Sequence, residues 1–286
     1  AVGGVVSVEA SNSLQGLSFF DAGLSDYAIE DTAAALMSTS TAAALESLNV
    51  DGVASITLVD AAANNLANAA DGVSLNTISG SLNNGATMSF SVEDSASALA
   101  TANAANSGAL NLADDVSVGA TGDNDLTVSE ADDLNLITGY KNTGGYTITD
   151  NAAAVAGSST TLLGDAISVS VTNNADATQG VTINGFEDTL GTITFNVVDS
   201  ATNLSANAAN LDLADVVSVD TTAGTTENDL TVDEADDLNS IPGYDHAGDY
   251  TITDDATAVA GSSTIILGDS SSVTVTGVAD ASQGVT

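Results

Sequence analysis

The sequence predicts an α/β repeat solenoid, in which strand–helix coils stack so that their parallel strands form one long sheet. Three observations predict this fold: a long internal repeat, a recurring phrase that changes from strand to helix spacing, and a composition rich in small residues. The alternative is a row of tandem Ig-like β-sandwich domains, since such domains have about 100 residues each. The helical spacing inside each repeat favours the solenoid, because a sandwich would continue the alternation of its strands.

The internal repeat is long. Residues 123–165 recur at 227–269, at an offset of 104 residues, and most of the paired positions are identical. The similarity extends back to the phrases that begin at Phe90 and Phe195. Because the chain starts without Met and stops inside a repeat, we expect it to be a stretch of a longer protein. We predict one continuous elongated array with three parts: divergent N-terminal repeats over 1–89, a long repeat unit over 90–194 and a second, truncated unit over 195–286.

A shorter phrase recurs inside the long unit. It begins with an aromatic or aliphatic residue, alternates apolar and polar positions up to an aspartate, and then continues with helical spacing. The alternating half predicts a strand with one buried face. The second half predicts a helix, as in Ala201, Leu204, Ala208 and Leu211, which share one face. The phrases begin at Tyr27, Ile56, Phe90, Tyr146, Phe195 and Tyr250.

Strands of a second type lie between these phrases, at Val116, Val169, Val217 and Val273. Two of them lead into helix starts, where Ala131, Leu134 and Ile137 share a face, as do the equivalent Ala235, Leu238 and Ile241. The strands of both types are spaced by about 27 residues on average, which is typical of one solenoid coil. Small alanines let helix and sheet approach closely, so the chain is expected to gain length by stacking.

Charge and composition exclude several classes of function. The chain has 39 acidic residues (Asp and Glu) but only 1 Lys and no Arg, which gives a formal net charge of −38 at pH 7. Nucleic acid and anionic membranes need a basic surface, so neither is an expected partner. The sequence has no Cys and 1 His, which leaves oxygen as the only ligand for metals. No apolar run reaches the roughly 18 residues of a transmembrane helix, so no direct membrane insertion is expected.

The acidic residues form three recurring groups. An aspartate ends each strand phrase, and for these residues we expect helix capping. A second group forms a turn with close-spaced oxygen donors and a Glu five residues after the last Asp, which could hold a hard cation such as Ca²⁺. The turn lacks the glycine and the length of an EF-hand, and the alternative is a solvated turn that leads into a capping box. A third group predicts the solvent face of a helix. The strand-end residues are Asp31, Asp60, Asp94, Asp150, Asp199 and Asp254; the metal candidates are Asp123, Asp125 and Glu130, repeated as Glu227, Asp229 and Glu234; the solvent-face residues are Asp132, Asp133, Asp236 and Asp237.

The phrases YTITDNAAAVAG, ISVSVT and LTVSEADDLN resemble the degenerate tandem repeats of large secreted bacterial surface proteins, the adhesins and S-layer-like proteins of Gram-negative bacteria and cyanobacteria. The resemblance covers most of the chain from Tyr27 onward. It implies export, an extracellular location at the cell surface, and calcium as a structural ion. The glycine-rich calcium nonapeptide of many such proteins is absent from this sequence, so that ligand set is not carried over.

These observations predict a non-enzymatic structural repeat segment that forms a rod, a filament or an S-layer-like lattice and is stabilised by divalent cations. Such a segment would self-associate end to end or laterally, and a cell-surface glycan is a further candidate partner. One alternative is an adhesin binding module that presents Thr-rich strand faces to a glycan, a mineral or ice. A weaker one is a glycan-cleaving enzyme with a single acidic pair. Lys141 and His246 have no counterpart in the other copy, which argues against a catalytic role for either at the repeat level.

Overall fold

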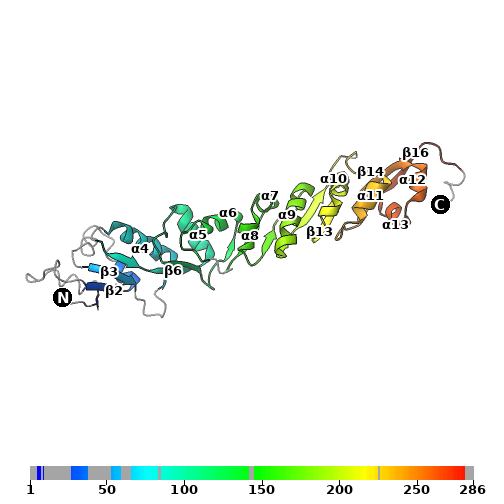
Figure 1. Cartoon of the computed structure of the whole chain (residues 1–286). Helices are drawn as coiled ribbons and strands as arrows, with labels where there is room; N and C mark the ends of the chain where they lie inside the picture. Colours follow the sequence, from blue (N-terminus) through cyan, green and yellow to red (C-terminus); the bar gives the residue numbers. More distant parts are fainter. Residues whose placement is uncertain are drawn as a thin grey trace, which may run out of the picture. The chain divides into compact units, whose positions relative to one another are not determined.

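The computed structural model describes residues 5–7, 9, 27–37, 53–58, 66–82, 85–141, 145–224 and 226–280 (Figure 1). The chain divides into two compact units, Ala1–Thr147 and Ile148–Thr286, and each is considered by itself below. Among the described residues, no helix combines the length and the apolar character that a bilayer crossing requires.

Unit 1 alternates short strands with helices. Its two parallel sheets have the strand orders β1-β2-β3-β5 and β4-β6-β7. Helix α2 packs on α4, α4 on α5, and α5 on α6. The strands are β1 (Val5–Val6), β2 (Tyr27–Asp31), β3 (Val53–Leu58), β4 (Leu66–Ala67), β5 (Thr87–Ser89), β6 (Ser91–Asp94), β7 (Asp115–Val118) and β8 (Asp125–Leu126); the helices are α2 (Ala33–Met37), α4 (Ala69–Ser81), α5 (Ala96–Ala105) and α6 (Val128–Asn135).

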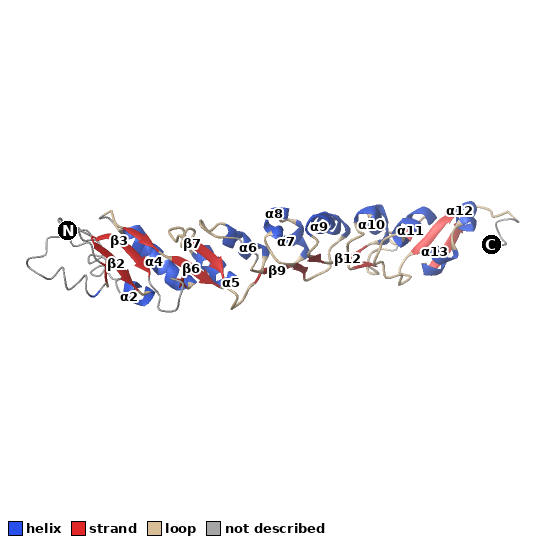
Figure 2. Cartoon of the chain, turned by 60° about the horizontal axis from the view of Figure 1, so that its bottom comes forward, coloured by secondary structure: helices blue, strands red, loops and turns tan. Residues whose placement is uncertain are grey.

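Unit 2 follows the same alternation. One of its sheets contains β11, β10 and β9 in that order, a second pairs β12 with β13, and a third has the order β14-β15-β16. Figure 2 shows helices α8 to α11 on one side of this unit and strands β9 and β12 on the other. The strands are β9 (Thr147–Asp150), β10 (Val169–Val171), β11 (Ile193–Thr194), β12 (Asn196–Asp199), β13 (Val216–Val219), β14 (Asp229–Leu230), β15 (Thr251–Asp255) and β16 (Ser272–Thr276); the helices are α7 (Ala152–Ala156), α8 (Thr160–Gly164), α9 (Ala177–Leu190), α10 (Ala201–Ala206), the 3₁₀ turn η2 (Ala208–Asn210), α11 (Val232–Asn239), α12 (Ala256–Gly261) and α13 (Thr264–Asp269).

The fold-class prediction is wrong in its central feature. The described strands form several small parallel sheets of two to four strands, not one long sheet, so the expected α/β repeat solenoid is replaced by a mixed α/β arrangement. The alternative of Ig-like β-sandwich domains is also wrong, because every strand pair in the described ranges is parallel and helices lie between the strands.

The sheets end where the chain changes strand partners. Strand β11 pairs with β10, whereas β12, which starts after Phe195, pairs with β13. The Phe195 N–H donates to the Asp215 carboxylate at 3.0 Å and the Phe195 carbonyl accepts from the Asp215 N–H at 2.9 Å. Phe90 separates β5 from β6 in the same way, since β5 pairs with β3 and β6 with β4 and β7. Thr194 and Asn196, on either side of Phe195, therefore belong to different sheets.

The predicted core positions are confirmed. The six phrase anchors are Tyr27, Ile56, Phe90, Tyr146, Phe195 and Tyr250, and all are buried. Ala131, Leu134 and Ile137 are buried on the face of α6 and the turn after it. The helix predicted over 201–211 is interrupted at Asn207, although its apolar face is buried throughout. Val273 is the one second-type strand anchor in the described part that is exposed, at 38%.

Glycine lets the two longest described helices approach their strands. A Cβ added at Gly180 in α9 would lie 2.8 Å from Val197 Cγ2 in β12. A Cβ at Gly72 in α4 would lie 2.6 Å from Val92 Cγ2 in β6. Both contacts are shorter than packed side chains tolerate. At each glycine, the helix backbone therefore packs directly against a valine side chain of the strand. This is the close approach that the small-residue composition indicates.

Candidate functional site

The strand-end aspartates join two neighbouring helices. In Asp94, Oδ1 accepts the N–H of Ser95 at 2.7 Å, and Oδ2 accepts the N–H of Ala69, the first residue of α4, at 2.9 Å. In Asp199, Oδ1 accepts the N–H of Ser200 at 2.7 Å, and Oδ2 accepts the N–H of Ala177, the first residue of α9, at 2.9 Å. One carboxylate therefore fixes the strand-to-helix turn and satisfies an orphan donor of the preceding helix.

Asp254 repeats this arrangement, with the N–H of Asp255 at 2.7 Å and that of Val232 at 3.0 Å. We call Asp94, Asp199 and Asp254 the junction aspartates. Capping is confirmed for them, but the helix that they cap is the earlier one, since the N-cap of the following helix is the next residue. In the same set, Asp31 accepts from the N–H of Thr32 and Asp150 from that of Asn151, and Asp60 lies outside the described residues.

The acidic turns cap helices as well, through an amide and a carbonyl. At the start of α5, the N–H of Ala96 donates to Asn124 Oδ1 at 2.8 Å, and the next N–H donates to the carbonyl of Asp123 at 3.1 Å. At the start of α10, the N–H of Ala201 donates to Asn228 Oδ1 at 2.8 Å, and the next N–H donates to the Glu227 carbonyl at 3.0 Å. The two copies of the repeat thus make the same pair of contacts.

The carboxylates of these turns accept hydrogen bonds within the chain. Asp123 Oδ1 accepts the N–H of Asp125 at 3.2 Å, and Asp125 Oδ1 accepts the hydroxyl of Thr147 at 2.9 Å. In the second copy, Asp229 Oδ1 accepts the hydroxyl of Thr251 at 2.8 Å, and Glu227 Oε2 accepts the N–H of Gly224 at 3.3 Å.

The two glutamates of the metal set turn away from the acidic turns. Glu130 Oε2 accepts the N–H and the hydroxyl of Thr127, both at 2.8 Å, and Glu234 makes the same two bonds to Thr231. Both pairs are capping boxes. Within the described ranges, no group of three or more His, Asp or Glu residues is placed to hold a metal ion. Calcium takes six to eight oxygen ligands, and calcium binding at these turns stays a prediction.

In Asp220, hydrogen bonds from a turn residue act on a carboxylate. The Thr222 hydroxyl donates to Asp220 Oδ1 at 2.7 Å and the Thr222 N–H donates to the same oxygen at 2.8 Å. The hydroxyl bond, followed by the backbone bond, lowers the pKa of the Asp220 carboxyl, because both donors favour the charged form.

We expect Thr222→Val to raise the pKa of Asp220 towards its ordinary value, because valine removes the hydroxyl donor. A lowered carboxyl pKa stabilises the folded chain above the ordinary pKa, and this contribution is lost as the pH falls through the lowered value. The variant should therefore lose less stability than the parent chain between neutral and acid pH. Carboxyl-carbon NMR titration measures the pKa, and Thr222→Ser, which keeps the hydroxyl, should retain the low value.

The two side chains without a counterpart in the other copy, His246 and Lys141, contact residues outside the acidic turns. His246 Nδ1 lies 2.9 Å from Asn239 Oδ1 and 3.0 Å from Asp269 Oδ2. Asn239 Nδ2 also donates to the Tyr250 hydroxyl at 2.9 Å, and burial raises the pKa of that tyrosine. Lys141 Nζ lies 2.5 Å from Asp115 Oδ1, and both side chains are exposed. These contacts attach turns to neighbouring elements.

The helical acids lie largely in solvent: Asp132, Asp236 and Asp237 are exposed and Asp133 is half-buried on α6 and α11, as predicted. The sequence reasoning missed the cap at Asn173, which accepts the Ala152 N–H at 2.7 Å, and it did not assign the helix-capping role of Asn124 and Asn228. The available signal was an Asn beside an acidic residue at the same position in both copies. No family model, curated protein or solved structure matches the chain.

Proposed function

We propose that this chain is a structural, non-enzymatic repeat segment of an extracellular bacterial surface protein, stabilised by divalent cations. The observation that carries the proposal is the repeated cap at α5 and α10, in which the turn of the following repeat receives the first two N–H groups of the helix. Asp94, Asp199, Asn124 and Asn228 hold one strand–helix element to the next through these contacts.

The structural role follows from the range of these contacts. Asp94 reaches a residue 25 positions earlier, and Asn124 and Asn228 reach residues 28 and 27 positions earlier. The N-termini of α4, α5 and α10 are therefore completed only when the next element is folded, which couples neighbouring elements in the manner of repeat proteins. A chain that must resist local opening outside the cell gains directly from such coupling.

Cations enter the proposal through charge. A net charge of −38 destabilises a compact state by self-repulsion, and ions relieve this by screening or by binding. Divalent cations do so more effectively than monovalent ones at equal ionic strength, because one ion can contact two carboxylates. In the repeated turns, Asp125 and Asp229 are exposed and each accepts one threonine hydroxyl, which makes these carboxylates the first candidates for such contacts.

We expect calcium to raise the midpoint of thermal unfolding above that in a chelator at matched ionic strength. In the double variant Asp125→Asn with Asp229→Asn, the calcium-dependent rise should shrink. Asparagine keeps an oxygen that can accept the Thr147 and Thr251 hydroxyls but loses the negative charge, so the midpoint in the chelator should stay within a few degrees of the parent value. Thermal melting followed by circular dichroism measures the unfolding midpoint of each variant in calcium, in chelator and in sodium chloride.

The control variant is Asp132→Asn with Asp236→Asn. These substitutions remove the same number of negative charges, but from exposed positions of α6 and α11 outside the turns. An equal loss of the calcium effect in both double variants would assign it to overall charge and exclude the turns as sites. A chain whose midpoint responds to neither calcium nor salt would remove cations from the proposal.

The location is tested separately. Antibodies raised against the chain should label intact cells that make the protein as strongly as permeabilised ones. Labelling that requires permeabilisation would contradict an extracellular role, whatever the melting experiments show.

A further inference from the structure

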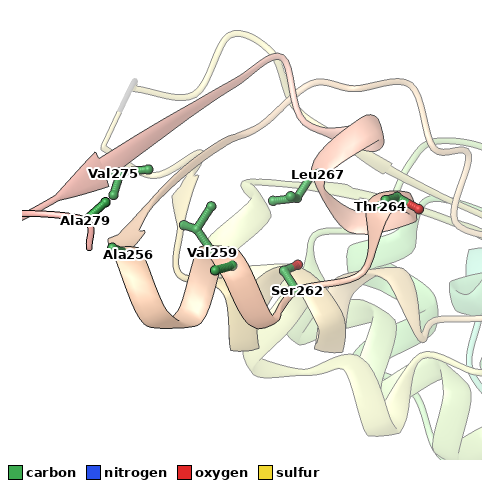
Figure 3. A pocket seen from close by; sticks show the side chains of 8 residues that line it. Ala256, Val259, Ser262, Thr264, Leu267, Val275 and Ala279 are labelled. Atoms are coloured by element: carbon green, nitrogen blue, oxygen red, sulfur yellow. The ribbon is translucent and has the colours of Figure 1, made fainter. Parts of the chain in front are cut away.

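The far end of unit 2 presents a shallow apolar pocket (Figure 3). It lies between α12, α13 and β16, and Figure 3 shows Val259, Leu267 and Val275 around the same space. All five residues of β16 are exposed, and Val275 is 45% exposed. Exposed apolar surface of this kind marks an interaction site more often than a random surface does.

The earlier copy of the same elements, α7, α8 and β10, buries the side chains that are exposed or half-buried here. At the offset of 104, Val259, Leu267 and Val273 correspond to Val155, Leu163 and Val169. The residues of the earlier copy are 0%, 0% and 1% exposed, whereas Val273 is 38% exposed and the other two are half-buried. The side chains are identical in the two copies, so only their surroundings differ.

A helix and a strand cover the earlier copy. Helices α7 and α8 both pack on α9, and β10 pairs with β11 in parallel, with Val169 opposite Ile193. The N–H of Val169 donates to the Thr192 carbonyl at 3.0 Å, and the N–H of Ala175 donates to the Asn196 carbonyl at 2.9 Å. The segment from α9 to β12 thus supplies both the apolar cover and the backbone partners.

Strand β16 has the geometry to receive the same cover. It pairs with β15 in the register Val273 to Ile252, which is the register of Val169 to Ile148 in the earlier copy. In the described part of its sheet, β15 is its only neighbour, so the edge that β10 turns to β11 has no strand beside it in β16.

We propose that this face of α12, α13 and β16 is the docking site for a repeat segment of the α9–β11 type, joined to the chain in cis after Asp280. The sequence ADASQG at 279–284 repeats ADATQG at 175–180, which includes Asp176 and Gln179, the capping box that starts α9. Residues 281–286 thus carry the first residues of such a helix by sequence. The proposal rests on the structural role of the repeats in the proposed function, and it does not depend on cations or location.

The test extends the full chain at Thr286 by a copy of residues 183–199, which completes the equivalent of α9, β11 and β12. Hydrogen exchange measured by NMR should slow at the Val273 and Ala279 amides by about tenfold or more, because these N–H groups correspond to Val169 and Ala175. The Ser271 amide, which already donates to the Tyr250 carbonyl, should change far less.

A matched control carries asparagine at the copies of Ile183, Ile193 and Val197, which are buried in the earlier copy. This extension should give no protection at Val273. Unchanged exchange in the unmodified extension would overturn the proposal, and equal protection by both extensions would overturn it as well.

Protection in the unextended chain that grows with protein concentration would assign the face to a second copy instead. A peptide of residues 175–199 added in trans should perturb the NMR signals of Val273 and Val275, even where the extended chain folds poorly. If the peptide causes no perturbation and exchange in the extended chain is unchanged, the docking proposal fails. The cation response predicted under the proposed function would then still stand.

Discussion

Asn228→Ala should lower the free energy of unfolding by about 1–3 kcal/mol, because it leaves the buried N–H of Ala201 without its acceptor. Asn228 is 8% exposed. Its Oδ1 accepts the buried N–H of Ala201 at 2.8 Å, and its Nδ2 donates to the carbonyl of Asp220 at 2.9 Å. Alanine supplies neither the acceptor nor the donor. Urea unfolding followed by circular dichroism measures the loss.

Two further variants show where the loss comes from. Asn228→Asp keeps an acceptor for the Ala201 N–H but removes the donor to Asp220, so its loss should lie between those of the parent and the alanine variant. Asn210→Ala removes the same amide from an exposed position of η2 and should change stability by less than about 0.5 kcal/mol. If Asn228→Ala costs no more than Asn210→Ala, the repeated caps do not hold the elements together.

The elements could be predicted because side-chain periodicity decides which face of a strand or helix is buried. Ala131, Leu134 and Ile137 recur at helical spacing and are all buried in the structure. The division into several sheets could not be predicted in the same way. Ile193, Phe195 and Val197 are buried in strict alternation across the point where the chain changes sheets. Alternation reports the buried face of an extended segment, and it carries no information on which strand receives the backbone hydrogen bonds.

The candidate site was predictable in residue type and not in geometry. The position of Asp94 before a helix predicts capping, and the structure confirms the capping role but places it on the preceding helix α4. The partner was beyond local reasoning, since the first N–H of α5 finds its acceptor at Asn124, 28 residues away. Glu130 fits both a cation site and a capping box by spacing, and its two hydrogen bonds to Thr127 show that the capping box forms.

Gly180→Val should destabilise the chain by about 3 kcal/mol, at the upper end of overpacking costs. A Cβ at Gly180 would already lie 2.8 Å from Val197 Cγ2 and 3.0 Å from Leu211 Cδ2, and valine adds two methyl groups. Both neighbours are fully buried, so neither can turn into solvent. Relief requires α9 to move away from β12, which would also disturb the bond from Ala177 to Asp199.

Gly185→Val is the matched control, since Gly185 is exposed in the same helix and a Cβ there would meet nothing within 4 Å. Its effect should stay within about 0.5 kcal/mol, because valine and glycine are both poor helix formers and no contact changes. Urea unfolding of the two variants compares them directly. Similar losses would mean that helix propensity, and not the approach of α9 to β12, makes glycine necessary at position 180. A large loss at Gly180 alone, repeated by Gly72→Val against Val92 in unit 1, would show that the close glycine contact holds helix to strand in both units.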